Sequence, residues 1–298
     1  PPAALVALAP PAAMAWRRVL HTTPLSALLG SAALSLFFVG ALYLWKLAGY
    51  REDNRNDVGT IQRRFLSTIV SCLCSASLLL FLSKPAEEGD LALTPAELFG
   101  FQPDGALAAC GQCLLLTAIL FVGPVVQHLV DVKTNGEQLL TWPPYPWRTA
   151  RDIVMAPAVE EIVFRACLVR LWDSAAFSEA VIIFCSPICF SLAHAHHFIE
   201  HVRNLDDKTM ALLQVAFQIF YTSLFGFYAT FLLLRTGSTY AVILTHGFCN
   251  HQGFPDIAFF VKKMHPLYRY RLALGAVYVA GVVGFVVLMV PLTRGFRP

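Results

Sequence analysis

The sequence predicts an all-α membrane protein, a polytopic bundle of about eight transmembrane helices. Of its 298 residues, 57% are hydrophobic and only 14% are charged, whereas a soluble domain carries about 25% charged residues. The mean hydropathy is +0.60, and apolar runs long enough to cross a bilayer recur along the chain. The net charge of +3 is spread over the loops, so the composition excludes nucleic acid as a partner.

The chain divides into a tail and one transmembrane domain. Residues 1–23 are rich in Ala and Pro and predict a poorly ordered N-terminal tail. Residues 24–298 form the transmembrane domain, with a catalytic core at about 150–256. The segment 131–151 carries WPPYPW and predicts a stretch at the membrane interface, because it has no apolar run near 20 residues. The predicted spans are 24–48, 65–83, 105–130, 152–172, 178–199, 210–234, 238–259 and 271–293.

Basic residues in the loops predict the orientation of the bundle. Apart from Arg165, most Lys and Arg residues fall after the first, third, fifth and seventh spans. Because basic loops stay on the cytosolic side, both termini are expected on the opposite side. The fourth span then begins at the cytosolic side, and the fifth and seventh spans run toward it.

Charged residues interrupt the fourth span. Glu160, Glu161 and Arg165 lie within the run PAVEEIVFRACLVR, where each charge at a helix centre costs roughly 2.5–3.5 kcal/mol. Glu161 and Arg165 are four residues apart and can pair on one helix face. Glu160 lies on another face and has no partner within its own segment. An ionisable residue inside a membrane predicts a functional site.

Two other spans bring polar groups to a similar depth. The fifth span ends with His194, and the seventh contains His246 and Asn250, which share a helix face. Two hydrogen-bond donors aimed at one point suit a developing oxyanion. A desolvated carboxylate such as Glu160 suits removal of a proton from water, and His194 can hold that water or protonate a leaving amine. The set predicts amide hydrolysis by an activated water.

Three other interpretations fit the same residues. His197, Glu200 and His201 match the H-x-x-E-H pattern of zinc peptidases, with Glu160 or His194 as a third ligand. The polar groups also suit a proton-coupled transporter, although the chain lacks paired broken helices in two matching halves. In a non-catalytic membrane scaffold, the same groups would only fix the packing of the helices.

Three short motifs occur in order on three of the predicted spans. EEIVFR fits E-E-x-x-x-R, Phe190 to His194 fits F-x-x-x-H, and His246 to Asn250 fits H-x-x-x-N. Together they resemble the type II CAAX prenyl proteases, the Ras-converting endopeptidases of the endoplasmic reticulum. The resemblance extends to FRACL, AHHFIEHVR and FCNHQGFP and is strongest over about 150–256.

The resemblance implies a glutamate-type intramembrane protease that cleaves after a prenylated cysteine and releases the last three residues of a CaaX protein. By motif match, Glu160 and His194 would activate the water. His246 and Asn250 would stabilise the oxyanion. The resemblance implies neither a metal nor another cofactor.

The resemblance also implies supporting residues and partners. Glu161, Arg165 and Phe190 would brace the site. The expected partners are farnesylated or geranylgeranylated CaaX proteins and membrane lipid. The expected location is the endoplasmic reticulum membrane, with the active site open to the cytosol. No motif specifies an oligomeric state.

Overall fold

The computed structural model describes residues 17–50, 54–85, 87, 93–136, 144–196, 198, 202 and 207–296. Within these residues the chain is almost entirely helical, which confirms the predicted all-α class. Two short strands, β1 (Arg18–Val19) and β2 (Lys84–Pro85), pair antiparallel, so the end of the predicted tail contacts the end of the second span.

The helical elements follow one another along the chain with short connections. In order they are α2 (Pro24–Ala41), α3 (Leu44–Leu47), α4 (Val58–Leu82), α5 (Pro95–Leu98), α6 (Ala106–Leu120), α7 (Val122–Asn135), α8 (Pro146–Ala150), η1 (Arg151–Met155), α9 (Ala156–Glu161), η2 (Ile162–Val169), α10 (Arg170–Ser174), α11 (Glu179–Ala193), η3 (His194–His196), α13 (Lys208–Thr236), α14 (Thr239–Gln252), η4 (Ala258–Phe260), η5 (Pro266–Tyr270), α15 (Arg271–Met289) and η6 (Pro291–Thr293).

Several of these helices can cross a membrane, which confirms the predicted polytopic bundle. Among the described residues, five helices are long and apolar enough, or six if the bent pair α6 and α7 is one span. The predicted fourth and seventh spans do not meet this criterion. Helix α14 has only 14 residues, fewer than the about 20 that a span needs. The fourth, from α8 to α10, is divided by the π-helical segments η1 and η2.

The second span begins earlier than its apolar run predicts. Helix α4 starts at Val58 rather than near residue 65, so it includes the charged residues Arg63 and Arg64. The Asp57 side chain accepts a hydrogen bond from the Thr60 backbone N–H at 3.1 Å. This N-cap satisfies one of the backbone donors that a helix start leaves open. A local cap therefore starts the helix outside the apolar run.

The third span bends where a straight helix was expected. Helices α6 and α7 meet at 63°, with Pro124 in the first turn of α7. Proline has no backbone N–H and cannot continue the hydrogen-bonding pattern of the preceding helix. Beside it, a Cβ on Gly123 would lie 2.6 Å from the Tyr278 ring. The bend therefore goes with close packing of α7 against α15.

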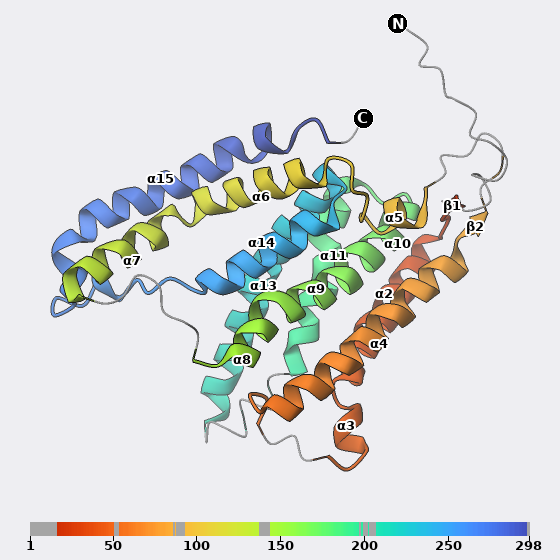
Figure 1. Ribbon diagram of the computed structural model, residues 1–298, viewed down its shortest axis with the longest axis horizontal. Coiled ribbons are helices and arrows are strands. Elements are labelled where there is room, and N and C mark those ends of the chain that lie inside the picture. Colours follow the sequence, from red (N-terminus) through yellow and green to blue (C-terminus); the bar gives the residue numbers. More distant parts are fainter. Residues whose placement is uncertain are drawn as a thin grey trace, which may run out of the picture.

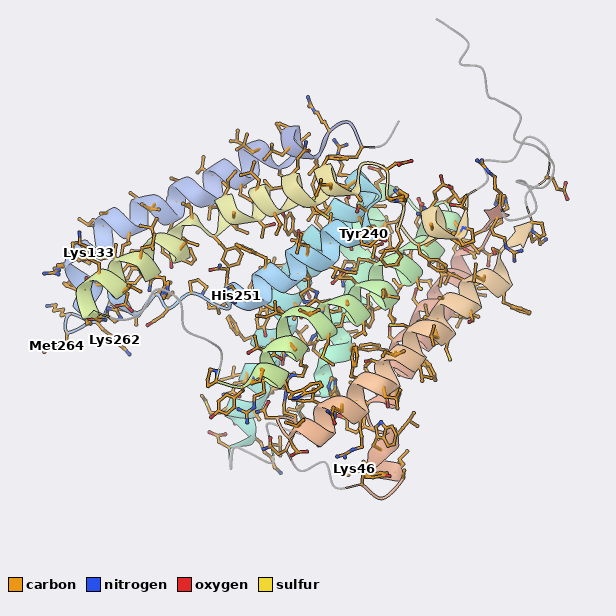
Figure 2. The ribbon with its side chains drawn as sticks, in the orientation of Figure 1. Lys46, Lys133, Tyr240, His251, Lys262 and Met264 are labelled. Atoms are coloured by element: carbon orange, nitrogen blue, oxygen red, sulfur yellow. The ribbon has the colours of Figure 1, made fainter. Side chains whose placement is uncertain are left out.

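The helices form two flanks around a central group (Figure 1). Helices α6, α7 and α15 pack along one flank, and α2 and α4 form the opposite flank. Between them lie α14, α13, α11 and the helical stretch from α8 to α10. Tyr240 and His251 mark the two ends of α14 (Figure 2), and the half that leads to His251 packs against η1.

The main apolar core surrounds η2 and α10. Phe164, Leu168 and Leu171 are buried in it, together with Trp172. The Trp172 indole N–H donates a hydrogen bond to Ser31 of α2 at 2.9 Å. Burial on this side holds the charged helix in place between the two flanks.

Candidate active site

Glu160 and Glu161 end the short helix α9 between two π-helical segments. Such segments are rare in proteins and occur frequently at functional sites. Consecutive helical residues are about 100° apart around the axis, so the two carboxylates face different surroundings. The Glu160 side chain is 19% exposed and the Glu161 side chain is fully buried.

Glu161 and Arg165 form the ion pair that their spacing predicts. The Arg165 Nε lies 3.3 Å from Oε2 of Glu161, and Nη1 donates to Oε1 at 3.3 Å. The Arg165 side chain is only 1% exposed. Its Cζ lies 4.3 Å from the centroid of the Phe190 ring, a cation–π contact that helps to stabilise a buried guanidinium. Phe190 therefore supports the pair from α11.

His246 of α14 extends this pair into a chain of three contacts. Its Nδ1 lies 2.7 Å from Oε1 of Glu161, and its Nε2 lies 3.8 Å from Oε2 of Glu160. An ionised carboxylate only accepts hydrogen bonds, so Nδ1 carries the proton in the bond to Glu161. The imidazole also packs against the Phe225 ring, with centroids 4.4 Å apart. The contact between His246 and Glu161 was not predicted from the sequence.

Close packing of two helices sets the position of His246. The next residue, Gly247, faces η1, and a Cβ there would lie 2.4 Å from the carbonyl oxygen of Ile153. Only a residue without a side chain permits this approach. The glycine of the motif therefore has a structural reason, because it lets α14 bring His246 to the glutamates.

Glu160 and His194 line one cavity of about 140 Å³. The walls come from α2, the start of α4, η1, α9 and the end of α11. The Nδ1 of His194 lies 3.0 Å from the Phe190 carbonyl oxygen, which can only accept a hydrogen bond. Nδ1 therefore carries a proton, and in the neutral ring Nε2 is the nitrogen that can accept one.

The cavity lies at the basic end of the bundle. Arg55, Arg64 and Arg151 line it together with Glu160 and His194. These arginines belong to the loops predicted to be cytosolic and to the helix starts beside them. The similar depth that was expected for the polar groups of the fourth and fifth spans is therefore present.

Asn250 lies apart from the cavity. Its Nδ2 donates a hydrogen bond to the backbone carbonyl of Asp152 at 2.8 Å, and its side chain is exposed. One turn before it, His246 contacts both glutamates. The two residues share a face of α14 as predicted, but in this structure they contact different groups.

The residues of the alternative zinc site cannot be compared with the structure. His197, Glu200 and His201 lie outside the described residues. Among the residues that are described, no three His, Cys, Asp or Glu side chains are grouped so that they could hold a metal ion.

These features define a polytopic helical membrane protein whose polar side chains meet inside the bundle, and three comparisons with known proteins identify its family. A family model described as type II CAAX prenyl endopeptidase Rce1-like matches residues 142–251. The chain is 36% identical to CAAX prenyl protease 2 of Homo sapiens, over 88% of this chain and 79% of the human protein.

Relatives from two other organisms cover similar shares. CAAX prenyl protease 2 of Arabidopsis thaliana is 30% identical over 88% of both chains. The protein of that name from Caenorhabditis elegans is 31% identical, over 87% of this chain and 94% of its own length. No solved structure gives a significant match. The chain belongs to the type II CAAX prenyl endopeptidase family.

Proposed function

We propose that this chain is an intramembrane endopeptidase that removes the last three residues of prenylated CaaX proteins, with Glu160 and His194 activating the attacking water. Relatives named CAAX prenyl protease 2 in an animal, a plant and a yeast support the reaction and its substrates. One observation supports the chemistry: the Glu160 carboxylate and the His194 imidazole line the same cavity.

The reaction begins with a water molecule held by these two side chains. Glu160 takes a proton from the water, and the oxygen attacks the carbonyl carbon that follows the prenylated cysteine. The tetrahedral intermediate then collapses, the C–N bond breaks, and the amine nitrogen of the leaving tripeptide takes a proton from Glu160 or His194. General acid–base catalysis of this kind contributes typically about 10²–10⁴ in rate.

His246 is proposed to stabilise the oxyanion through Nε2. Since Nδ1 donates to Glu161, a donor at Nε2 requires the doubly protonated ring. Glu161, itself held by Arg165, fixes the orientation of that ring. Asn250 is proposed as the second donor, with one amide hydrogen kept on the Asp152 carbonyl.

The walls of the cavity suit a substrate anchored in lipid. Phe38 and Leu42 of α2 and Phe65 of α4 give it an apolar lining. A prenyl chain gains about 0.8 kcal/mol for each CH₂ that it buries, so a farnesyl or geranylgeranyl group stays in the bilayer while the peptide enters. The arginines at this end favour a cytosolic opening, and the proposed location is the endoplasmic reticulum membrane.

The test uses membranes that contain the protein and a farnesylated CaaX peptide. Glu160→Gln and His194→Ala are expected to abolish release of the C-terminal tripeptide, measured by mass spectrometry, while the protein still accumulates. Glu179→Gln is the matched control, because Glu179 is exposed in the first turn of α11, at the other end of the helix from His194. Near-normal tripeptide release by either site variant contradicts the assignment.

A further inference from the structure

We propose that Arg55, Arg64 and Arg151 form a subsite that binds the α-carboxylate of the substrate's last residue. The inference rests on the proposed function, because a peptide cut three residues from its end carries that carboxylate close to the scissile bond. All three arginines line the cavity that contains Glu160. A guanidinium is suited to this ligand, because its planar fork matches the two oxygens of a carboxylate.

Arg64 belongs to the wall that α4 contributes. Ile61, Phe65 and Thr68 line the cavity with it, and this spacing of three, four and seven residues defines one helix face. The face is apolar except for Arg64 and the Thr68 hydroxyl. A cation on an apolar wall of a cavity has an electrostatic effect on a bound anion that water screens little.

Arg55 and Arg151 are held next to each other at the opening. Arg151 Nη1 donates to the Arg55 backbone carbonyl at 2.9 Å and to Asn56 Oδ1 at 3.1 Å. These bonds attach the loop before α4 to η1, so the two guanidinium groups come from segments in direct contact. A preformed arrangement of this kind reduces the entropy lost on binding a ligand.

The charges of the cavity match one additional anion. Its lining contains three arginines and one carboxylate, that of Glu160. A second carboxylate, Asp152, forms an ion pair with Arg151 at 2.7 Å. The two acids leave an excess of one positive charge within this group. The single α-carboxylate of a peptide balances it.

The spacing along the helix matches the length of the leaving peptide. Arg151 and Glu160 lie on the same helical stretch, about 13 Å apart at the α-helical rise of 1.5 Å per residue. Three extended residues span about 10 Å, and a flexible arginine side chain covers the difference. A carboxylate at the arginines therefore places the third peptide bond from the end near Glu160.

The test compares two farnesylated peptides that differ only in a C-terminal acid or a C-terminal amide. The wild-type protein is expected to cleave the acid with a kcat/KM about tenfold higher, as for the loss of one hydrogen-bonded charge. Arg64→Gln is expected to lower kcat/KM for the acid about tenfold and to affect the amide far less. Arg64→Lys, which keeps the charge, is expected to restore part of the preference.

Arg63→Gln is the matched control. Arg63 is the neighbouring residue of α4, but it packs over the Tyr50 ring at 5.1 Å and does not line the cavity. Its substitution is expected to leave the preference for the acid unchanged. Equal cleavage of acid and amide by the wild-type protein overturns the subsite, as does a preference that Arg64→Gln does not reduce. Cleavage of neither peptide by the wild-type protein overturns the proposed function itself.

A second measurement needs no variant and so does not depend on folding. The free tripeptide with the sequence of the released product is added as an inhibitor of the wild-type protein, either as the acid or as the amide. The subsite predicts an inhibition constant about tenfold lower for the acid. Equal inhibition by the two forms contradicts it.

Discussion

Replacing Glu161 by glutamine separates the two roles that the structure gives to this buried carboxylate. Glu161 neutralises Arg165 on one side and orients His246 on the other. Glutamine has nearly the same shape but no charge. The variant Glu161→Gln is therefore expected to lower both the stability of the fold and the rate of cleavage.

The loss of stability follows from the burial of Arg165. Its side chain is 1% exposed, and Glu161 is its ion-pair partner. Removing one partner of a buried pair costs about 3–5 kcal/mol. The cation–π contact with Phe190 remains in the variant, so the lower end, about 3 kcal/mol, is expected. Thermal unfolding in detergent measures this loss.

The loss of activity follows from the orientation of His246. Second-shell partners of a functional histidine are worth about 10–100-fold, and one oxyanion donor is worth about 10²–10³. A fall in kcat of about 100-fold is therefore expected, with KM for a farnesylated peptide nearly unchanged. Adding Arg165→Met removes the unpaired charge, so the double variant is expected to regain stability but not activity.

Asp173→Asn provides the matched control, since it replaces another acid by its amide. Asp173 pairs with Arg170 at 3.0 Å on a surface where the aspartate side chain is 39% exposed. Exposed pairs of this kind are worth less than about 1 kcal/mol. The reasoning is refuted if Glu161→Gln melts like the wild-type protein and keeps kcat within about threefold of it.

Three further results are expected. Gly247→Ala should lower both stability and activity, because its Cβ would lie 2.4 Å from the Ile153 carbonyl oxygen, while Gly111→Ala, which meets no atom within 4 Å, should not; equal melting of the two variants contradicts this packing. Asn250→Ala should lower kcat by about 10²-fold if its amide is an oxyanion donor, whereas a change in stability alone would leave it only the bond to Asp152. Treatment with 1,10-phenanthroline should not change tripeptide release, and inhibition reversed by added zinc would favour the alternative metal site.

The helical membrane architecture and the meeting of distant residues could be predicted from the sequence. Low charge and repeated apolar runs gave the bundle, and the distribution of arginines gave one end of it as basic. Glu160 and His194 do line a cavity with Arg64 at that end. Depth along a helix is readable from residue counts, because the rise per residue is constant.

The side-chain partners could not be predicted in the same way. The pair Glu161 and Arg165 follows from helical periodicity alone, but the bond from His246 to Glu161 depends on how α14 rotates against η1. That rotation depends on the close contact at Gly247, which no periodicity shows. One signal was available: two carboxylates with a single arginine in one apolar run leave a negative charge that needs another partner.

The helix boundaries differ from the prediction for local reasons. Asp57 caps α4 before its apolar run begins, and Pro124 accompanies the bend between α6 and α7. The charged stretch from α8 to α10 and the short helix α14 lie between the two flanks of the bundle (Figure 1). Apolar run length predicts spans well only for helices that face lipid, because helices surrounded by protein need not be apolar throughout.

The arrangement also explains why two adjacent glutamates are needed where one base performs the proposed chemistry. A base must reach the substrate, and Glu160 faces the cavity. A carboxylate that orients His246 must instead be shielded, since water would compete for its hydrogen bonds, and Glu161 is fully buried. Neighbouring positions on a helix differ by about 100°, so adjacent residues can satisfy both requirements while contacting the same imidazole. Exchanging these roles would require the helix to rotate, which the buried ion pair with Arg165 opposes.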